Sequence, residues 1–116
     1  MEQSELYWLA GLLEADGTFC QWFTVKNGVR SPMCNIQLNM SDLDTVQKAQ
    51  KLLEVQTITK RKQSGLGTKQ MYQITQGKRD TVKRLALELY PLMSKRRQEQ
   101  IEALIWTCEN LDRRVQ

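Results

Sequence analysis

Leu9-Ala10-Gly11-Leu12-Leu13-Glu14-Ala15-Asp16-Gly17 is the stretch from which the rest of the fold can be worked out. It is typical of the last turns of a helix that begins near Ser4, a residue type favoured at the N-cap. Apolar residues recur at helical spacing along one side of this helix: Leu6, Leu9, Ala10 and Leu13. We expect this face to pack on the core of the chain itself.

A second stripe of the same helix has almost no side chain at its centre. Tyr7, Gly11 and Ala15 follow one another at intervals of four residues. Small residues four apart allow another backbone to approach closely, a steric rule that holds outside membranes as well as inside them. The sequence therefore predicts that this stripe packs against a second helix.

The C-terminal end of the helix carries an unusual charge. Unpaired carbonyl groups make a helix C-terminus partly negative, so cations are favoured there, yet this chain has Glu14 and Asp16. Carboxylates beside carbonyl oxygens repel one another unless a divalent cation lies between them, and such oxygen-rich sites suit Mg²⁺ or Ca²⁺. Gly17 is predicted to be the C′ residue that ends the helix. The alternative is that Asp16-Gly17 is merely a turn.

Residues 9–17 resemble the LAGLIDADG motif of the homing endonucleases, differing only by Leu13 for Ile and Glu14 for Asp. The order of elements predicted below extends this resemblance over nearly the whole chain. In that family the motif helix forms the interface between domains or subunits, and its last acidic residue binds the catalytic metal. The resemblance thus implies a metal-binding role for Asp16 and a structural role for Glu14.

The composition is that of one soluble globular domain, residues 1–116, with 41% hydrophobic and 26% charged residues. The longest apolar run, residues 7–13, is far too short to span a bilayer, and no secretion signal is recognisable. The three cysteines are widely spaced and form no CxxC pair: Cys20, Cys34 and Cys108. They indicate reduced thiols and hence an intracellular location, in a bacterial, phage or organellar setting.

The chain contains no histidine. This excludes Ser-His-Asp and Cys-His nucleophiles, histidine-ligated zinc and nucleases with a histidine general base. An enzyme with this composition has to work with carboxylates, lysine, water and a hard metal ion.

The net charge of +4 is modest but unevenly distributed. Residues 60–97 are rich in Lys and Arg, opposed there only by Asp80 and Glu88. A sustained basic stretch suits a polyanion such as nucleic acid. A solvated surface kept soluble by lysines is the alternative, and charge alone does not decide between them.

Two hairpins are predicted from alternating patterns. Residues 18–26 and 33–40 flank the turn signal Asn27-Gly28, and residues 56–62 and 70–75 flank a Gly-rich loop at 64–68. In the second strand Ile36 and Leu38 alternate with amides. Each hairpin thus has one apolar face and one face of amides and hydroxyls.

Three further helices complete the pattern. One follows a capping box at residues 41–44, one runs from Asp80 to Tyr90 before Pro91, and the last runs from Ser94 towards Leu111. The fold class is therefore α+β, in the order α-β-β-α-β-β-α-α, with a four-stranded antiparallel, saddle-shaped sheet covered by helices on one face. The motif occurs once, so we expect a C₂ homodimer through the motif helix.

The first turn of the last helix holds three cations, Lys95, Arg96 and Arg97, at a helix end that is itself partly positive. We interpret this turn as a phosphate site. The family resemblance implies more specific roles. Asp16 and the carbonyl of Ala15 would bind the metal, Lys95 (or, with a one-residue shift, Arg96) would be the active-site cation, and Asp42 would lie near the metal-bound water. The alternative for Asp42 is a capping role. The interface would use Tyr7, Gly11, Leu12 and Ala15.

The polar sheet face is expected to lie along the major groove of DNA, two hairpins to each half-site. Amides suit adenine edges, arginine suits guanine, and lysine suits phosphates. The candidate DNA-binding residues are Thr18, Cys20, Trp22, Thr24, Lys26, Arg30, Met33, Asn35, Gln37, Asn39, Thr57, Thr59, Arg61, Met71, Gln73 and Thr75. Trp22 departs from the polar pattern. It is interpreted as stacking, as packing on thymine methyl groups, or as a sign that the register slips there.

The function implied is that of a homodimeric, Mg²⁺-dependent homing endonuclease that hydrolyses both strands of a long, nearly palindromic DNA site, with Mn²⁺ or Ca²⁺ able to replace Mg²⁺ for binding. Its biology would be the mobility of an intron or a similar element. Two alternatives remain: a maturase that binds host intron RNA, and a catalytically silent DNA-binding regulator. An intact Asp16 disfavours both.

Overall fold

A computed structural model describes residues 1–62 and 69–109. The elements are α1 (Gln3–Asp16), β1 (Gly17–Lys26), β2 (Val29–Met40), α2 (Leu43–Leu52), β3 (Thr59–Lys62), β4 (Gln70–Gln76), α3 (Arg79–Leu89), the 3₁₀ turn η1 (Tyr90–Leu92) and α4 (Lys95–Glu109). The predicted α+β class and element order are confirmed. The Gly-rich loop and Leu111 lie outside the described residues. No helix among those described is long and apolar enough to cross a membrane.

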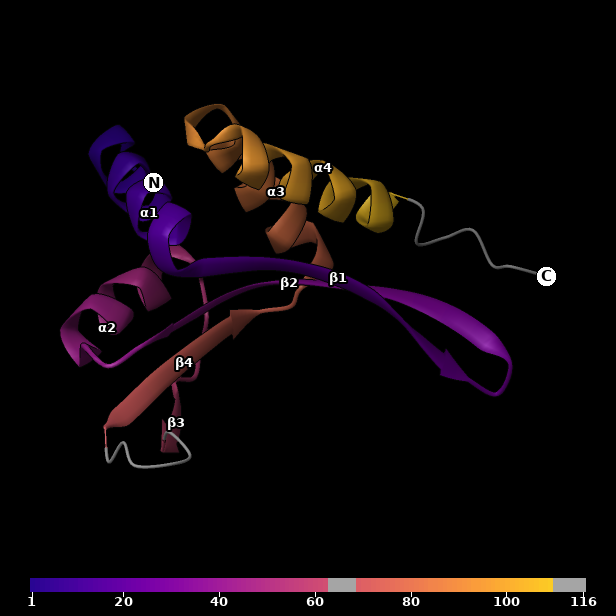
Figure 1. Cartoon of the computed structure of the whole chain (residues 1–116), viewed down its shortest axis with the longest axis horizontal. Helices are drawn as coiled ribbons and strands as arrows, with labels where there is room; N and C mark the ends of the chain where they lie inside the picture. Colours follow the sequence, from indigo (N-terminus) through magenta and orange to yellow (C-terminus); the bar gives the residue numbers. More distant parts are fainter. Residues whose placement is uncertain (63–68, 110–116) are drawn as a thin grey trace.

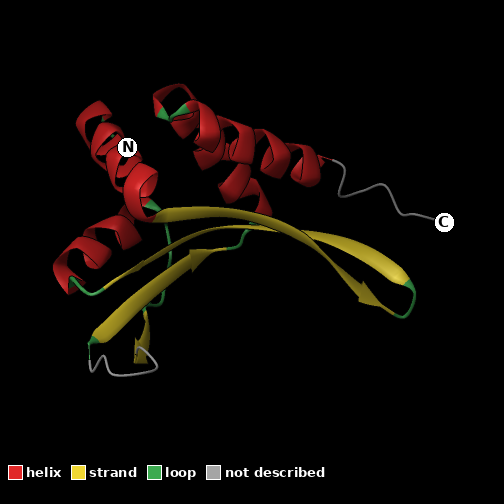
Figure 2. Ribbon diagram, viewed as in Figure 1, coloured by secondary structure: helices red, strands yellow, loops and turns green. Residues whose placement is uncertain are grey.

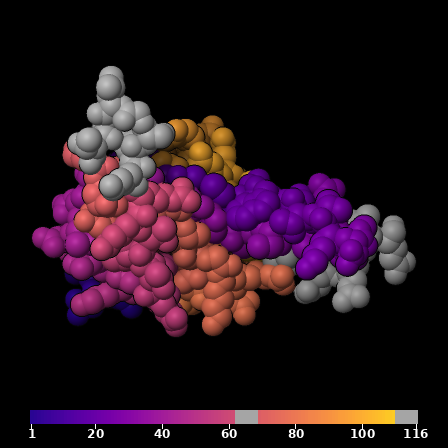
Figure 3. Space-filling view, turned by 90° about the horizontal axis from the view of Figure 1, so that it is seen from below, coloured from indigo at the N-terminus to yellow at the C-terminus, as the bar shows by residue number. Residues whose placement is uncertain are grey.

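The four strands form one antiparallel sheet in the order β1-β2-β4-β3. Helices α1, α3 and α4 lie over one face, and the sheet curves so that its open side is concave (Figures 1 and 2). Seen from below, the purple atoms of the β1–β2 hairpin extend away from the rest of the molecule (Figure 3). The saddle expected from the sequence is therefore present in the chain.

The core lies between the sheet and the helices. In the sheet, Ile36 of β2 pairs with Phe19 of β1, and Leu38 pairs with Ile74 of β4, so all four side chains point to the helical side. The helices contribute fully buried leucines and one isoleucine to the same cluster: Leu9, Leu13, Leu85, Leu89, Leu104 and Ile101. Burying one such side chain contributes about 1.5–3 kcal/mol. This cluster fixes the sheet on α1 and α4.

The junction between α1 and β1 differs from the predicted helix end. Gly17 has extended dihedral angles, φ −83° and ψ 165°, and not the left-handed conformation that a C′ glycine usually adopts. The reason for glycine is steric, because a Cβ atom there would lie 2.6 Å from Leu13 Cδ2 and 2.8 Å from Leu13 Cα. The chain therefore passes directly from Asp16 into the sheet.

The β1–β2 hairpin extends beyond the body of the protein as a two-stranded arm (Figure 1). β2 pairs with β4 only from Ile36 to Met40, so the rest of β2 has a neighbour on one side alone. That explains why Pro32, which lacks an N–H group, is tolerated inside a strand. Asn27 and Gly28 have φ angles of 54° and 74°, as a type I′ turn requires.

Several element boundaries differ from the sequence prediction. Helix α1 begins at Gln3 with a reciprocal capping box between Glu2 and Glu5, so Ser4 lies inside the helix. β2 begins at Val29 because the open edge accepts Pro32. β3 begins at Thr59, which leaves Thr57 outside the strand. Propensity marks the interior of an element better than its ends.

The thiols of Cys34 on β2 and Cys108 on α4 meet in the core, with their sulfur atoms 2.9 Å apart. All three cysteines are free thiols, as expected. Burial, followed by the contact with Cys34, raises the pKa of Cys108 to about 12. The pair behaves as a small apolar contact that joins the base of the arm to α4.

Replacing Gly17 by alanine should destabilise the fold by about 1–3 kcal/mol, because the new methyl group collides with backbone atoms of Leu13. Gly77→Ala is the matched control, since a Cβ at Gly77 meets nothing within 4 Å. Urea unfolding of both variants measures the difference, and equal stability would contradict the steric explanation.

Candidate functional site

The end of α1 meets the start of α4 through Glu14. Its carboxylate accepts a hydrogen bond from the backbone N–H of Ser94 at 2.6 Å and another from the Ser94 hydroxyl at 2.8 Å. These are the free donors at the start of α4, where an acid is favoured. The bond from the Ser94 N–H is the main reason that the pKa of Glu14 lies below its ordinary value. Glu14 therefore caps α4, which agrees with the structural role that the sequence resemblance implied.

Arg97, in the first turn of α4, binds the end of α1. Its guanidinium donates from Nη2 to the backbone carbonyl oxygen of Glu14 at 3.1 Å, and its Nη1 donates to Gln100 at 3.0 Å. The guanidinium also lies 3.8 Å from the Glu14 carboxylate, and Arg97 is only 7% exposed. A cation thus binds the negative end of α1 after all. The expectation that both acids require a divalent cation is wrong for Glu14, and the expectation of a free phosphate site is wrong for Arg97.

Asp16 is left as the exposed acid at this junction. Its carboxylate takes part in none of the hydrogen bonds or salt bridges found within residues 1–62 and 69–109. Lys95 and Arg96 are exposed in the first turn of α4, and the charge of Arg96 contributes to lowering the pKa of Glu14. One acid and two cations are therefore exposed at this junction, where they can act on something outside the chain.

The described part of one chain holds no group of three His, Cys, Asp or Glu side chains close enough for a metal site. Asp16 and the nearby carbonyl groups are hard oxygen donors of the kind that Mg²⁺ prefers. They fit such an ion in type but are too few to hold it. Further ligands would have to come from a second chain or from a bound phosphate.

Asp42 is the N-cap residue of α2, and its carboxylate accepts a hydrogen bond from the Thr45 hydroxyl at 2.8 Å. It makes no side-chain bond to the helix backbone. The structure thus shows a local contact for Asp42, and its catalytic role stays a prediction.

The small-residue stripe of α1 faces away from the core. Gly11 and Ala15 are exposed, Tyr7 is 52% exposed, and Leu12 is half-buried. A Cβ atom built on Gly11 meets nothing within 4 Å. No contact inside the described chain therefore explains why glycine, a poor helix former, occupies the middle of this helix.

The strand register brings the predicted polar row together on the concave face. The Cα pairs along this row are Thr18–Gln37, Cys20–Asn35, Trp22–Met33, Thr24–Ser31, Lys26–Val29, Gln37–Thr75, Asn39–Gln73, Thr59–Gln73 and Arg61–Met71. Most of these side chains are exposed or half-buried. Asn35 is an exception, being 5% exposed with no partner for its Oδ1 atom among the described residues.

The row differs from the prediction at four positions: two predicted residues lie outside it and two residues that were not predicted belong to it. Arg30 pairs with Val25 on the opposite face of the arm, where its guanidinium lies 4.0 Å from the centre of the Phe23 ring. Ser31 and Val29 share the concave face, which the sequence prediction missed because it started this strand at Met33. Thr57 precedes β3.

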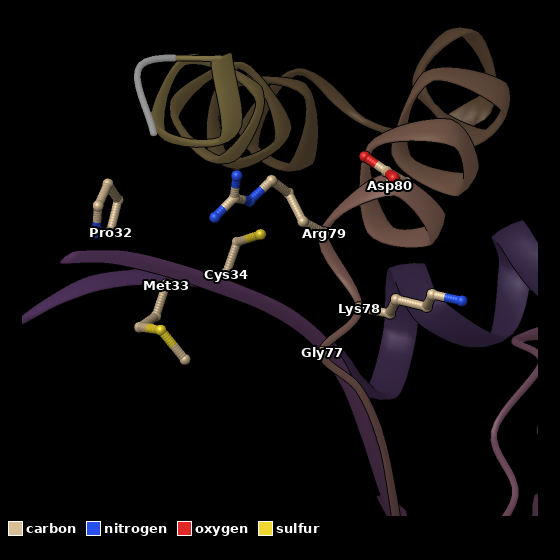
Figure 4. Close-up of a pocket in the computed structure, with 7 residues that line it drawn as sticks. All are labelled: Pro32, Met33, Cys34, Gly77, Lys78, Arg79 and Asp80. Carbon is tan, nitrogen blue, oxygen red and sulfur yellow. The ribbon is translucent and has the colours of Figure 1, made fainter. Parts of the chain in front are cut away.

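An open pocket of about 380 Å³ lies where the arm meets the start of α3. Figure 4 shows the Arg79 side chain reaching over β2 towards Cys34, whereas Met33 points to the other side of the strand. The pocket is lined by Pro32, Met33, Cys34, Gly77, Lys78, Arg79 and Asp80, so it includes none of the residues at the tip of α1. It does not contribute to the junction of α1 and α4.

No protein-family model matches the sequence, and no curated protein matches it either. Solved structures do match. The homing endonuclease I-CvuI, in complex with the I-CreI target, superposes with a TM-score of 0.74 at 17% identity, over 96% of this chain and 69% of that one. I-CeuI, a group I intron-encoded homing endonuclease complexed with DNA, gives 0.71 at 13% identity, over 94% and 56%. I-TnaI gives 0.71 at 11% identity, over 93% and 74%.

The chain has the LAGLIDADG homing endonuclease fold. Within this LAGLIDADG fold, α1 is the motif helix and its last residue, Asp16, begins the link into the sheet. Sequence reasoning missed the Arg97 contact, although a signal was present. Arg97 lies at helical spacing from Ile101, Leu104 and Cys108, which form the buried face of α4. An arginine on such a face is expected to find a buried partner.

Replacing Glu14 by glutamine should lower the free energy of unfolding by about 1 kcal/mol near neutral pH, because the charge-assisted bonds to Ser94 weaken. The folded-state pKa of Glu14 is lowered from 4.5. Its contribution is therefore present above that pH and is lost as the pH falls through the folded-state pKa. Urea unfolding from pH 7 to pH 3 should show the variant converging on the wild type. Glu99→Gln, an exposed acid on α4, is the control, and a constant difference across this range would contradict the assignment.

Proposed function

We propose that this protein is a homodimeric, divalent-metal-dependent endonuclease that cuts double-stranded DNA at a specific, nearly palindromic site, as homing endonucleases do. The observation that carries the proposal is the end of α1. There an exposed Asp16, without a partner in the described chain, stands at the start of a concave polar sheet, on the helix where a Cβ added to Gly11 would meet no other described residue within 4 Å. The neighbouring structures of this fold include complexes with DNA.

The dimer follows from the α1 stripe. A two-fold axis beside Gly11 would pack two copies of α1 at close range and bring two copies of Asp16 together. The two concave sheets would then continue one another along a duplex. A two-fold symmetric protein reads two related half-sites, which explains why the target should be nearly palindromic.

Asp16 and the carbonyl group of Ala15 would hold Mg²⁺ together with their symmetry mates and DNA phosphates, and Mn²⁺ or Ca²⁺ would replace it for binding. The ion would polarise the phosphate and lower the pKa of bound water. The remaining roles would belong to other side chains of the protein. Lys95, or Arg96 beside it, would stabilise the negative charge that grows on the phosphate, and Asp42 would orient a water molecule. No step requires a histidine, in agreement with the composition.

Recognition would come from the concave face. Amides such as Gln37, Asn39 and Gln73 can pair with adenine edges, and Arg61 can pair with guanine. Lys26 at the end of β1 suits a phosphate. The face would read base edges in the major groove, because neighbouring side chains of the row stand on adjacent strands and point the same way.

Two other functions use the same scaffold. A maturase would bind host intron RNA, and a regulator would bind DNA without cutting it. Neither needs a free acid at the end of α1, so the exposed Asp16 favours the nuclease. Incubating the protein and Mg²⁺ with a plasmid that carries the uninterrupted host locus separates them. Tight DNA binding without cleavage in Mg²⁺ or Mn²⁺ favours the regulator, and binding confined to intron RNA favours the maturase.

Replacing Asp16 by asparagine should reduce cleavage at least about 10³-fold, because a metal ligand is lost. Binding of the duplex in Ca²⁺ should change little. Gel assays of cleavage and binding on the same DNA measure both quantities. Asp44→Asn, an exposed acid in the first turn of α2, is the control. Wild-type cutting by the Asp16 variant would show that Asp16 is not the metal ligand.

Gly11→Leu should abolish dimerisation by forcing the two α1 helices apart. Gly11→Ala makes the test sharper. The added methyl meets nothing inside the described chain, so it should stabilise the helix by up to about 1 kcal/mol while still weakening the dimer. Analytical ultracentrifugation and thermal unfolding measure the two effects separately. A normal dimer in the Leu variant would rule out this interface.

A further inference from the structure

Two apolar side chains interrupt the polar row of the concave face. Trp22 on β1 and Met33 on β2 are Cα partners across the hairpin, so they stand side by side on one face. Each is 40% exposed. In Figure 4, Met33 points away from Cys34 and from the helical side of β2, which places its side chain on the concave face.

The hairpin register removes one explanation for Trp22. A slip by one residue would move the tryptophan to the helical side, yet Phe19 and Ile36 pair in the core three residues away on each strand. Trp22 therefore belongs to the concave face. Stacking on a base is also disfavoured in a duplex, because the flat faces of the bases are covered by their neighbours and only the edges are accessible in the groove.

We infer that Trp22 and Met33 form an apolar contact that recognises the 5-methyl group of thymine in each half of the target. This inference rests on the proposed function. Thymine is the natural base that presents a methyl group in the major groove. An indole ring and a flexible thioether offer it a wide apolar surface, and exposed apolar area of this kind gains free energy when it is covered.

The structure also indicates where in the target this thymine lies. Trp22 is six residues beyond Asp16 along β1, which corresponds to about 20 Å of strand. At about 3.4 Å per base pair, the preference should fall roughly five to seven base pairs from the centre of the site. The Thr24–Ser31 pair lies further out along the arm, and the Cys20–Asn35 pair lies nearer the centre.

The experiment begins with selection of bound duplexes from a randomised pool, in Ca²⁺. The selected site is then synthesised with thymine or with uracil, which lacks only the methyl group, at one symmetric pair of positions at a time. The wild type should bind the uracil duplex about fourfold more weakly for each methyl group it covers. This loss should be confined to positions five to seven.

Side-chain variants assign the effect. Trp22→Ala and Met33→Ala should bind thymine and uracil duplexes equally well, whatever their absolute affinity, so that a general weakening of the arm does not mimic the result. Phe23→Ala is the matched control. Phe23 is the next residue on β1, is 39% exposed, and stands on the opposite face under Arg30. It should keep the wild-type difference between the two duplexes.

Three results would count against the thymine contact. Equal binding of thymine and uracil duplexes by the wild type overturns the inference, as does an equal loss of discrimination in Phe23→Ala. Selection of guanine at these positions would also overturn it, since it would mean that the indole N–H donates to a base acceptor. A pool with no enriched duplex would instead refute the proposed function itself.

Discussion

The carboxylate of Glu14 binds the first turn of α4, and the guanidinium of Arg97 binds the last turn of α1. Each helix thus supplies the charge that the end of the other one needs. Taken separately, an acid at a C-terminus and an arginine at an N-terminus are unfavourable. Together they form a partly buried cross-link between residues 80 or more positions apart in the chain. This cross-link holds the motif helix on α4.

The rest of the site follows from that contact. With Glu14 and Arg97 paired, Asp16 and the exposed cations of α4 lie near the same junction without being neutralised by it. Gly17 then lets the chain enter β1 directly, because no side chain separates the strand from Leu13. The acid and the first residues of the concave face are therefore joined directly, without an intervening loop. The proposed endonuclease would need such a link, since its cut would have to keep a fixed distance from the bases that are read.

The two ends of the sheet differ in width and in the support that lies behind them. Near β4 it is four strands wide and backed by the core, so its open face is firmly supported. Outside the residues that pair with β4 it narrows to the two-stranded arm, and residues 21–31 are exposed on both faces. At the base of the arm, the thiol of Cys34 packs against that of Cys108 on α4, and the Arg79 side chain lies above β2. A curved sheet with a narrow arm has the shape that the proposed reading of a DNA groove would require.

The sequence by itself determined the features that depend on residues close together in the chain. The apolar face of the motif helix, the alternation of Ile36 and Leu38 with amides, and the Asn27-Gly28 turn all follow from the periods of helix and strand or from local backbone chemistry. So does the α+β class. The absence of histidine limits the available chemistry by composition alone, whatever the fold.

The tertiary structure decided which of several similar residues are available. Glu14 and Asp16 have the same chemistry, two residues apart, and only the contact with Ser94 shows that one is occupied and the other exposed. Arg97 is buried and paired, whereas Lys95 and Arg96 in the same turn are exposed. Asn35 is buried although it alternates with apolar residues just as the exposed side chains of the concave face do. The physical reason is that a side chain's partners lie far along the chain, so that burial and pairing are properties of the packed molecule, whereas the period of a helix or strand is a property of its own few residues.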